Sequence, residues 1–129
     1  GKLISIDLPN PNGNKLSDGS STFIGDNQVG WLIPDYLKKR WELLIGNSKL
    51  LLPKLLNNKS NFPDIFLHDS LHTEVHTSYE INSILKKVSK CIILCDNIEM
   101  GSGTALEKIL IRLNLLGYSY KNFGGFKTY

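Results

Sequence analysis

Residues 64–76, DIFLHDSLHTEVH, decide the predicted fold. Residues 64–67, in which an apolar run follows Asp64, are typical of a short buried strand. Polar residues follow it at once, and from Val75 to Val88 apolar residues recur at helical spacing. The stretch therefore predicts a strand, a polar turn and a helix, in that order along the chain.

The same alternation continues on both sides of this stretch. On the N-terminal side, residues 3–8 indicate a strand that Pro9 ends, 34–40 a short helix, and 41–45 a second strand. Asn47 or Ser48 would then cap a leucine-rich helix to about residue 56, kinked or delayed by Pro53.

On the C-terminal side, residues 91–95, CIILC, form a continuous apolar run, which is typical of a strand buried on both faces. Thr104 and Glu107 match a capping box, so the last helix is predicted to begin there and to end at Gly117. Gly101-Ser102-Gly103 lacks both phosphate-loop patterns and is interpreted as a lead-in to this helix.

Strands that alternate with helices predict an α/β fold with a parallel sheet and helices on both faces. The 129 residues, 41% of them hydrophobic, suit a single domain over 1–129. Residues 9–30 are rich in Asn, Gly, Ser and Asp and form a long loop, of the length that usually carries function or is disordered.

Composition and charge argue against a nucleic-acid partner and against a membrane-spanning segment. The net charge is +3 and the basic residues are scattered, which argues against a nucleic-acid partner. No apolar stretch is long enough to span a membrane and no signal peptide is present. Cys91 and Cys95 lie four apart in one strand and are predicted to be reduced core residues, which favours a cytoplasmic protein.

Polar residues follow each predicted strand directly. In parallel sheets ligands bind at the carboxyl ends of the strands, so these residues are the candidates for a binding site. Asp69, Asp96 and Asn97 offer hard oxygen donors that suit Mg²⁺ or another divalent ion, although Asp and Asn also end strands as turn formers. His72 lies three residues after Asp69. It is placed either as a general base near neutral pH or as a solvated histidine at a helix start.

Two further groups of polar residues could bind a ligand or serve only a structural role. Asp7 could accept hydrogen bonds from ribose hydroxyls, or it could simply end its strand in a turn. His68, His72 and His76 are spaced four apart and suggest zinc, but His68 belongs to the strand and no HExxH pattern is present.

With these positions defined, the chain resembles class I S-adenosylmethionine-dependent methyltransferases, above all the metal-dependent small-molecule O-methyltransferases of the catechol, caffeoyl-CoA and macrocin types. The resemblance rests on DIFLHDSLH followed by IILCDN. It implies a Rossmann-like sheet, a divalent metal held by Asp69, Asp96 and Asn97, and His72 as the catalytic base.

On the cofactor side, ISIDLPNP resembles the family's second strand, and WELLIGNSKLLLPKL resembles its third strand and helix. The resemblance then implies that Asp7 binds the ribose and that Asn47 and Ser48 lie near the adenine. His68 is assigned to the same side of the site. The implied reaction is methyl transfer from S-adenosylmethionine to a hydroxyl of a small-molecule acceptor.

Two features depart from the family pattern. The first strand, with its glycine-rich turn, is not in the sequence, and Leu71 stands where the caffeoyl-CoA type has a second acid. The domain is thus expected to be partial, with its central gap closed by an N-terminal segment or in a homo-oligomer. Two alternatives stay open: a metal-dependent hydrolase that uses His68, Asp69 and His72, and a non-catalytic interaction module.

Overall fold

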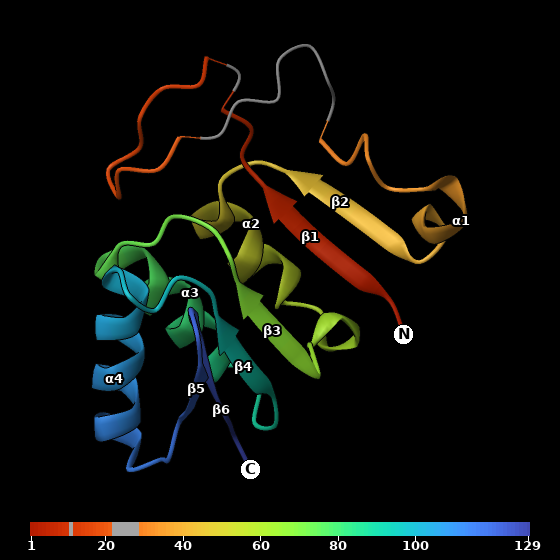
Figure 1. Cartoon of the computed structure of the whole chain (residues 1–129). Coiled ribbons are helices and arrows are strands. Elements are labelled where there is room, and N and C mark those ends of the chain that lie inside the picture. The colour runs from red at the N-terminus through yellow and green to blue at the C-terminus, as the bar shows by residue number, and fades with distance from the viewer. Residues whose placement is uncertain (11, 22–28) are drawn as a thin grey trace.

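The computed structural model describes residues 1–10, 12–21 and 29–129, and it has mixed α/β architecture (Figure 1). The expected loop at 9–30 therefore lies partly outside the described residues. The helices and strands of the structure are, in chain order, β1 (Leu3–Asp7), α1 (Asp35–Lys38), β2 (Trp41–Ile45), α2 (Ser48–Leu55), a 3-10 turn η1 (Lys59–Asn61), β3 (Ile65–His68), α3 (Glu74–Leu85), β4 (Ile92–Cys95), α4 (Gly101–Leu113), β5 (Tyr118–Tyr120) and β6 (Phe123–Lys127).

The strands form two sheets in place of the single sheet that the sequence predicts. β1 and β2 pair in parallel, and a second sheet has the order β3-β4-β6-β5. In that sheet β3 and β4 are parallel, whereas β6 runs antiparallel to both of its neighbours. Among the described residues no backbone pairing joins β1 to β3.

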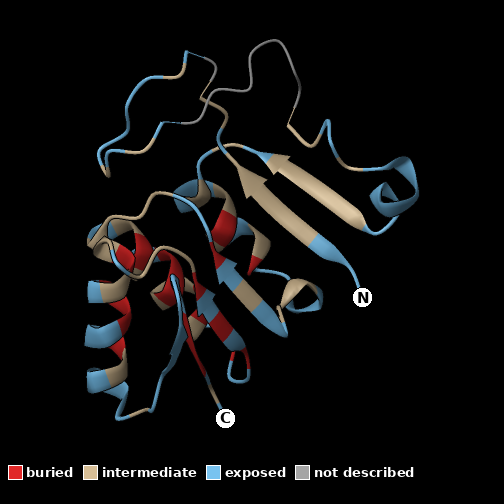
Figure 2. Ribbon diagram, in the orientation of Figure 1, coloured by how far each residue is buried: buried red, intermediate tan, exposed pale blue. Residues whose placement is uncertain are grey.

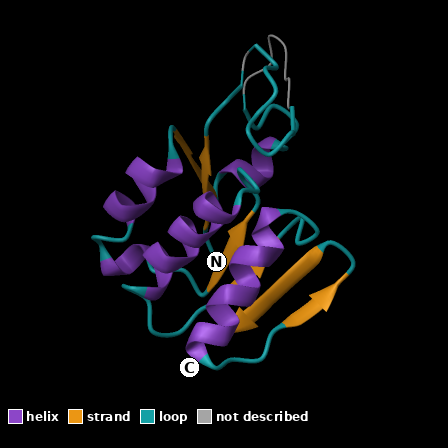
Figure 3. Cartoon of the chain, turned by 90° about the vertical axis from the view of Figure 1, so that its left-hand side faces the viewer, coloured by secondary structure: helices purple, strands orange, loops and turns teal. Residues whose placement is uncertain are grey.

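Helices α2, α3 and α4 cover one face of the four-stranded sheet, and the core lies between them and the strands. The core residues from α2 and α3 include Leu52, Leu56, Ile81 and Ile84, and those from the sheet and α4 are Ile93, Cys95, Phe126, Leu106 and Ile109. Figure 3 shows most of the helical mass on one side of the strands. Burial raises the pKa of the Cys95 thiol to about 12, so this thiol is a protonated core group.

None of the segments that the structure describes covers the opposite face of the four-stranded sheet, which corrects the prediction of helices on both faces. Along β4, Ile93 and Cys95 are buried, whereas Ile92 and Leu94 are 39% and 37% exposed. β3 alternates in the same way (Figure 2). The interpretation of 91–95 as a strand buried on both faces was wrong, and 64–67 is not the buried strand that was predicted. An apolar run alone does not report whether another segment covers it.

Local capping explains where the helices begin. Asn47 caps α2 by accepting a hydrogen bond from the backbone of Lys49, as predicted. Pro53 lies inside α2 and cannot donate to the carbonyl of Lys49, but the hydroxyl of Tyr79 donates to that carbonyl at 2.9 Å. The helix therefore continues through the proline with its freed acceptor satisfied.

The last helix begins three residues before the predicted capping box. Its N-cap is Met100, and Asn114 in the left-handed conformation ends it, so Thr104 and Gly117 have neither of the predicted roles. Gly101 is the first residue of α4 and packs against the backbone of residues 72–74, where a Cβ would collide with it. This close approach brings the start of α4 against the turn that carries His72.

Within the described residues, no helix has the length and apolar character needed to cross a lipid bilayer.

Candidate metal centre

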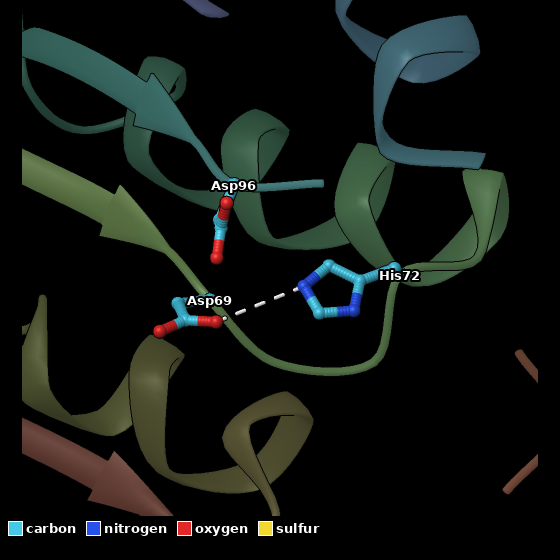
Figure 4. A group of neighbouring side chains, drawn as sticks. All are labelled: Asp69, His72 and Asp96. Carbon is cyan, nitrogen blue, oxygen red and sulfur yellow. Dashed lines mark ion pairs between the residues drawn. The ribbon is translucent and has the colours of Figure 1, made fainter. Parts of the chain in front are cut away.

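Three of the predicted site residues converge at the carboxyl ends of β3 and β4. The two strands are in register with His68 opposite Cys95, and the backbone N–H of Asp96 donates to the carbonyl of His68 at 3.0 Å. Asp69 and Asp96 therefore leave the sheet side by side. One ligand atom each from Asp69, His72 and Asp96 lies within 4.8 Å of the other two (Figure 4). We call this group the aspartate–histidine cluster.

His72 enters the cluster from the turn between β3 and α3. Thr73 caps α3 by accepting from the backbone of His76, which fixes the position at which the turn ends. The Nε2 atom of His72 lies 3.7 Å from Asp69 Oδ1. This atom is buried and has no hydrogen-bond partner among the described residues. A buried polar atom without a partner is costly, so its lone pair or proton is available to a ligand.

Asp18, from the long loop, holds the other side of His72. Its Oδ2 accepts a hydrogen bond from the backbone N–H of His72 at 2.9 Å and lies 3.6 Å from Nδ1 of the ring. Burial would raise the pKa of Asp18, but hydrogen bonds from Ser20 and from the backbone of His72 outweigh it and lower the pKa. Asp18 is thus a carboxylate next to Nδ1 and able to orient the ring.

A second, buried group of polar residues surrounds Glu80, which is 4% exposed. His68 Nδ1 donates to Glu80 Oε2 at 2.7 Å, and His76 Nε2 donates to Oε1 at 2.9 Å. Ser70 donates to both carboxylate oxygens, at 3.3 and 3.2 Å. We call this group, with Thr77 and Ser48, the Glu80 network.

The network is internally satisfied. The hydroxyl of Thr77 lies 2.9 Å from His68 Nε2, and that of Ser48 lies 3.1 Å from His76 Nε2. Burial alone would raise the pKa of Glu80, but the hydrogen bonds from His68, His76 and Ser48 lower it well below the ordinary range. Two of the residues bonded to Glu80, His68 and Ser70, flank Asp69. The network therefore restrains the backbone that carries this candidate metal ligand.

Not every predicted site residue joins the cluster. Asn97 has a left-handed backbone, and its amide donates to Glu99 at 2.9 Å, so the side chain is directed at Glu99. His68 is fully buried with both ring nitrogens bonded inside the Glu80 network. In the hydrolase alternative His68 was a ligand, yet Asp96 is the third member of the observed cluster.

The cofactor-side residues end the other two parallel strands. Asp7 is the last residue of β1 and is half-buried, opposite Ile45 of β2. The Asn47 side chain is exposed and occupied in capping α2, and Ser48 contacts His76. Surface hollows lie between α4 and β5 and beside the N-terminus, and neither is lined by Asp7 or by the cluster.

The donor set fits a divalent cation. Two carboxylates suit Mg²⁺ or Mn²⁺, and an imidazole as a third ligand extends the choice to Fe²⁺ or Zn²⁺. Asp69 is 60% exposed, so water or a substrate oxygen has access from one side. The unpartnered Nε2 of His72 is the feature that ordinary strand-end aspartates do not explain.

Two residues of the site were missed from the sequence. Asp18 is one of many polar residues in a loop, and nothing in the spacing links it to His72. Glu80 did carry a signal, because it lies between Thr77 and Ile84 on the buried face of α3. An acid on an apolar helix face requires buried partners, and His76 one turn earlier is one of them.

Compared with protein-family models, curated proteins and solved structures, the chain matches none of them. The function must therefore be argued from the geometry of these residues.

Proposed function

We propose that this chain is the metal-binding and nucleoside-binding part of an S-adenosylmethionine-dependent methyltransferase that acts on a hydroxyl of a small molecule. The observation that carries the proposal is the convergence of Asp69, His72 and Asp96 at the ends of two parallel strands. These residues come from DIFLHDSLH and IILCDN, the two stretches that resemble the metal-dependent O-methyltransferases.

The order of the strands supports a Rossmann-like arrangement. In the usual doubly wound sheet, the first strand is central, with the second and third on one side and the fourth and fifth on the other. If the β1-β2 pair continues the sheet on the far side of β3, the position between β1 and β3 would correspond to that central strand. The order of the chain reverses at this position, and such switch points bind ligands.

In this arrangement Asp7 and the aspartate–histidine cluster would flank the switch point. Asp7 ends β1 on one side, and Asp69 follows β3 on the other. A nucleoside bound between them would have its ribose near Asp7 and its reactive end toward the cluster. This division of roles fits a transferase that must hold a nucleoside cofactor and an acceptor at neighbouring points.

The residues of the cluster would divide the work on the acceptor. A divalent cation held by Asp69 and Asp96 would bind the acceptor oxygen and lower the pKa of its hydroxyl. His72 would accept the proton at Nε2, the ring atom that has no partner among the described residues. Asp18, 3.6 Å from Nδ1, would hold the ring in place and stabilise the charge that His72 gains.

The test is calorimetric titration of the chain with S-adenosylhomocysteine, with and without Mg²⁺. We expect binding that Asp7→Ala weakens about tenfold or more, because a buried hydrogen bond to a charged group is lost. The matched control is Asp35→Ala, on a side chain that is 94% exposed at α1, which should leave the affinity unchanged.

The alternatives predict different results. A metal-dependent hydrolase would bind the cation but not S-adenosylhomocysteine, and Asp7→Ala would have no effect. A non-catalytic interaction module would bind neither. Absence of S-adenosylhomocysteine binding in a folded sample would therefore contradict the methyltransferase proposal for this chain.

A further inference from the structure

The uncovered face of the four-stranded sheet is continuous and apolar. Strand register aligns Ile65 with Ile92 and Leu67 with Leu94, and it places Leu94 beside Gly125. Tyr118 lies opposite Gly125 on the other side, and Tyr120 opposite Phe123. Seven large side chains thus share this face, and their exposed fractions run from 37% to 78%. They are Ile65, Leu67, Ile92, Leu94, Phe123, Tyr118 and Tyr120. We call them the open sheet face.

The open sheet face is larger than a monomer usually leaves in water. If each side chain offers about 150–250 Å² when fully exposed, the range that holds for aromatic residues, these seven leave on the order of 600–1,000 Å² uncovered. The largest apolar patch on a typical monomer is about 300–600 Å². A standard protein interface needs about 800 Å² from each partner.

The charge of this face suits a copy of itself. On the register of the four strands, Lys127 is the one charged residue that the described structure assigns to the face. It lies at the rim, opposite Ile92 at the start of β4, with its Nζ 5.5 Å from the centre of the Tyr129 ring. A two-fold axis across the strands would put the two Lys127 side chains at opposite ends of a dimer.

We propose that two copies of this chain pack through the open sheet face, sheet against sheet, in a two-fold dimer. Two such faces pack about 10 Å apart with their strands nearly aligned, and side chains of both sheets interdigitate. The contact is isologous, so each copy offers the same seven residues and the assembly closes at two. This proposal is independent of the proposed function.

The test is sedimentation velocity of the whole chain over a wide concentration range. We expect a reversible monomer–dimer equilibrium with a micromolar dissociation constant. Ile65→Lys puts a charge into the contact and should raise the dissociation constant about tenfold or more. The matched control is Ile111→Lys on α4, at a position that is 73% exposed and away from the open sheet face, and it should leave the equilibrium unchanged.

A second variant guards against misfolding of the first. Tyr118→Ser acts at the other edge of the face, where the side chain is 78% exposed, and circular dichroism reports whether each variant keeps its fold. Two outcomes would overturn the proposal. One is a wild-type chain that stays monomeric throughout, which would leave the face to a different polypeptide. The other is an equal effect of Ile65→Lys and Ile111→Lys.

Discussion

The Glu80 network and the aspartate–histidine cluster are both built from histidines and acids that lie a few residues apart. They differ in how many of their polar atoms have hydrogen-bond partners. In the network, both nitrogens of His68 and both oxygens of Glu80 have partners inside the protein. In the cluster, Nε2 of His72 has no partner among the described residues, and Asp69 is largely exposed. The presence of histidines and acids therefore does not distinguish the two groups. A buried ring nitrogen without a partner, beside an exposed carboxylate, does.

The largest effect that this comparison predicts is on stability. Glu80→Ala would leave His68 and His76 without their shared acceptor in the interior. Leaving a buried donor without its acceptor costs about 1–3 kcal/mol of unfolding free energy for each donor. Urea denaturation followed by circular dichroism measures this loss, and Glu99→Ala is the matched control on an exposed acid. A loss of less than about 1 kcal/mol would show that the network contributes little.

The same network predicts acid sensitivity. The pKa of Glu80 is lowered in the folded protein, so its contribution is complete above the pKa of the unfolded chain and falls as the pH drops toward the folded value. Stability should therefore decrease below about pH 4. Glu80→Gln removes the titrating group, so its unfolding free energy should fall less steeply in this range. Equal slopes for both proteins would contradict the lowered pKa.

The cluster predicts an effect on metal binding with little effect on stability. Asp96→Asn removes a charged ligand, and we expect Mn²⁺ affinity to fall by about 10–100-fold or more. Asp64→Asn is the matched control, because Asp64 is exposed and precedes β3 at the opposite end from Asp69. Calorimetric titration with Mn²⁺ decides the matter. If both variants bind Mn²⁺ like the wild type, the cluster is not a metal centre.

His72 can be tested separately as a base or as a ligand. If His72 acts as the base, His72→Ala keeps most of the Mn²⁺ affinity, within about threefold, because the two carboxylates hold the ion. If it is a ligand, the loss approaches that of Asp96→Asn. Titrating both variants with Mn²⁺ under the same conditions compares the two roles directly. A loss equal to that of Asp96→Asn would assign His72 to the metal.

The sequence could predict the strands and helices because their hydrophobic spacing is local. β2 was predicted with the observed bounds, and the turn that follows β3 was correctly placed. It could not predict the open sheet face, because burial of Ile92 and Leu94 depends on which distant segment covers them. Nor could it predict Asp18, because its contact with His72 joins two residues that lie 54 positions apart in the sequence.

The proximity of Asp69, His72 and Asp96 could be predicted for a definite reason. Parallel strands in register deliver the residues that follow them to one edge of the sheet, so Asp69 and Asp96 had to meet. The direction of a side chain was harder to predict. Asn97 follows Asp96 directly, yet its left-handed backbone and its bond to Glu99 direct the amide elsewhere.

The smallest predicted effect concerns the point where the network and the cluster meet. Ser70 follows Asp69 directly and donates to both oxygens of Glu80. Ser70→Ala removes these bonds, but Glu80 keeps His68 and His76, so we expect a stability loss of only about 0.5–1.5 kcal/mol. Because Ser70 restrains the backbone that carries Asp69, Mn²⁺ affinity should also fall by a few fold. Ser83→Ala, whose hydroxyl donates to the backbone carbonyl of Tyr79 in α3, should change only stability. If Ser70→Ala lowered stability without any change in Mn²⁺ binding, the network and the cluster would be separate features. A loss of both stability and Mn²⁺ affinity would show that the Glu80 network positions the aspartate–histidine cluster.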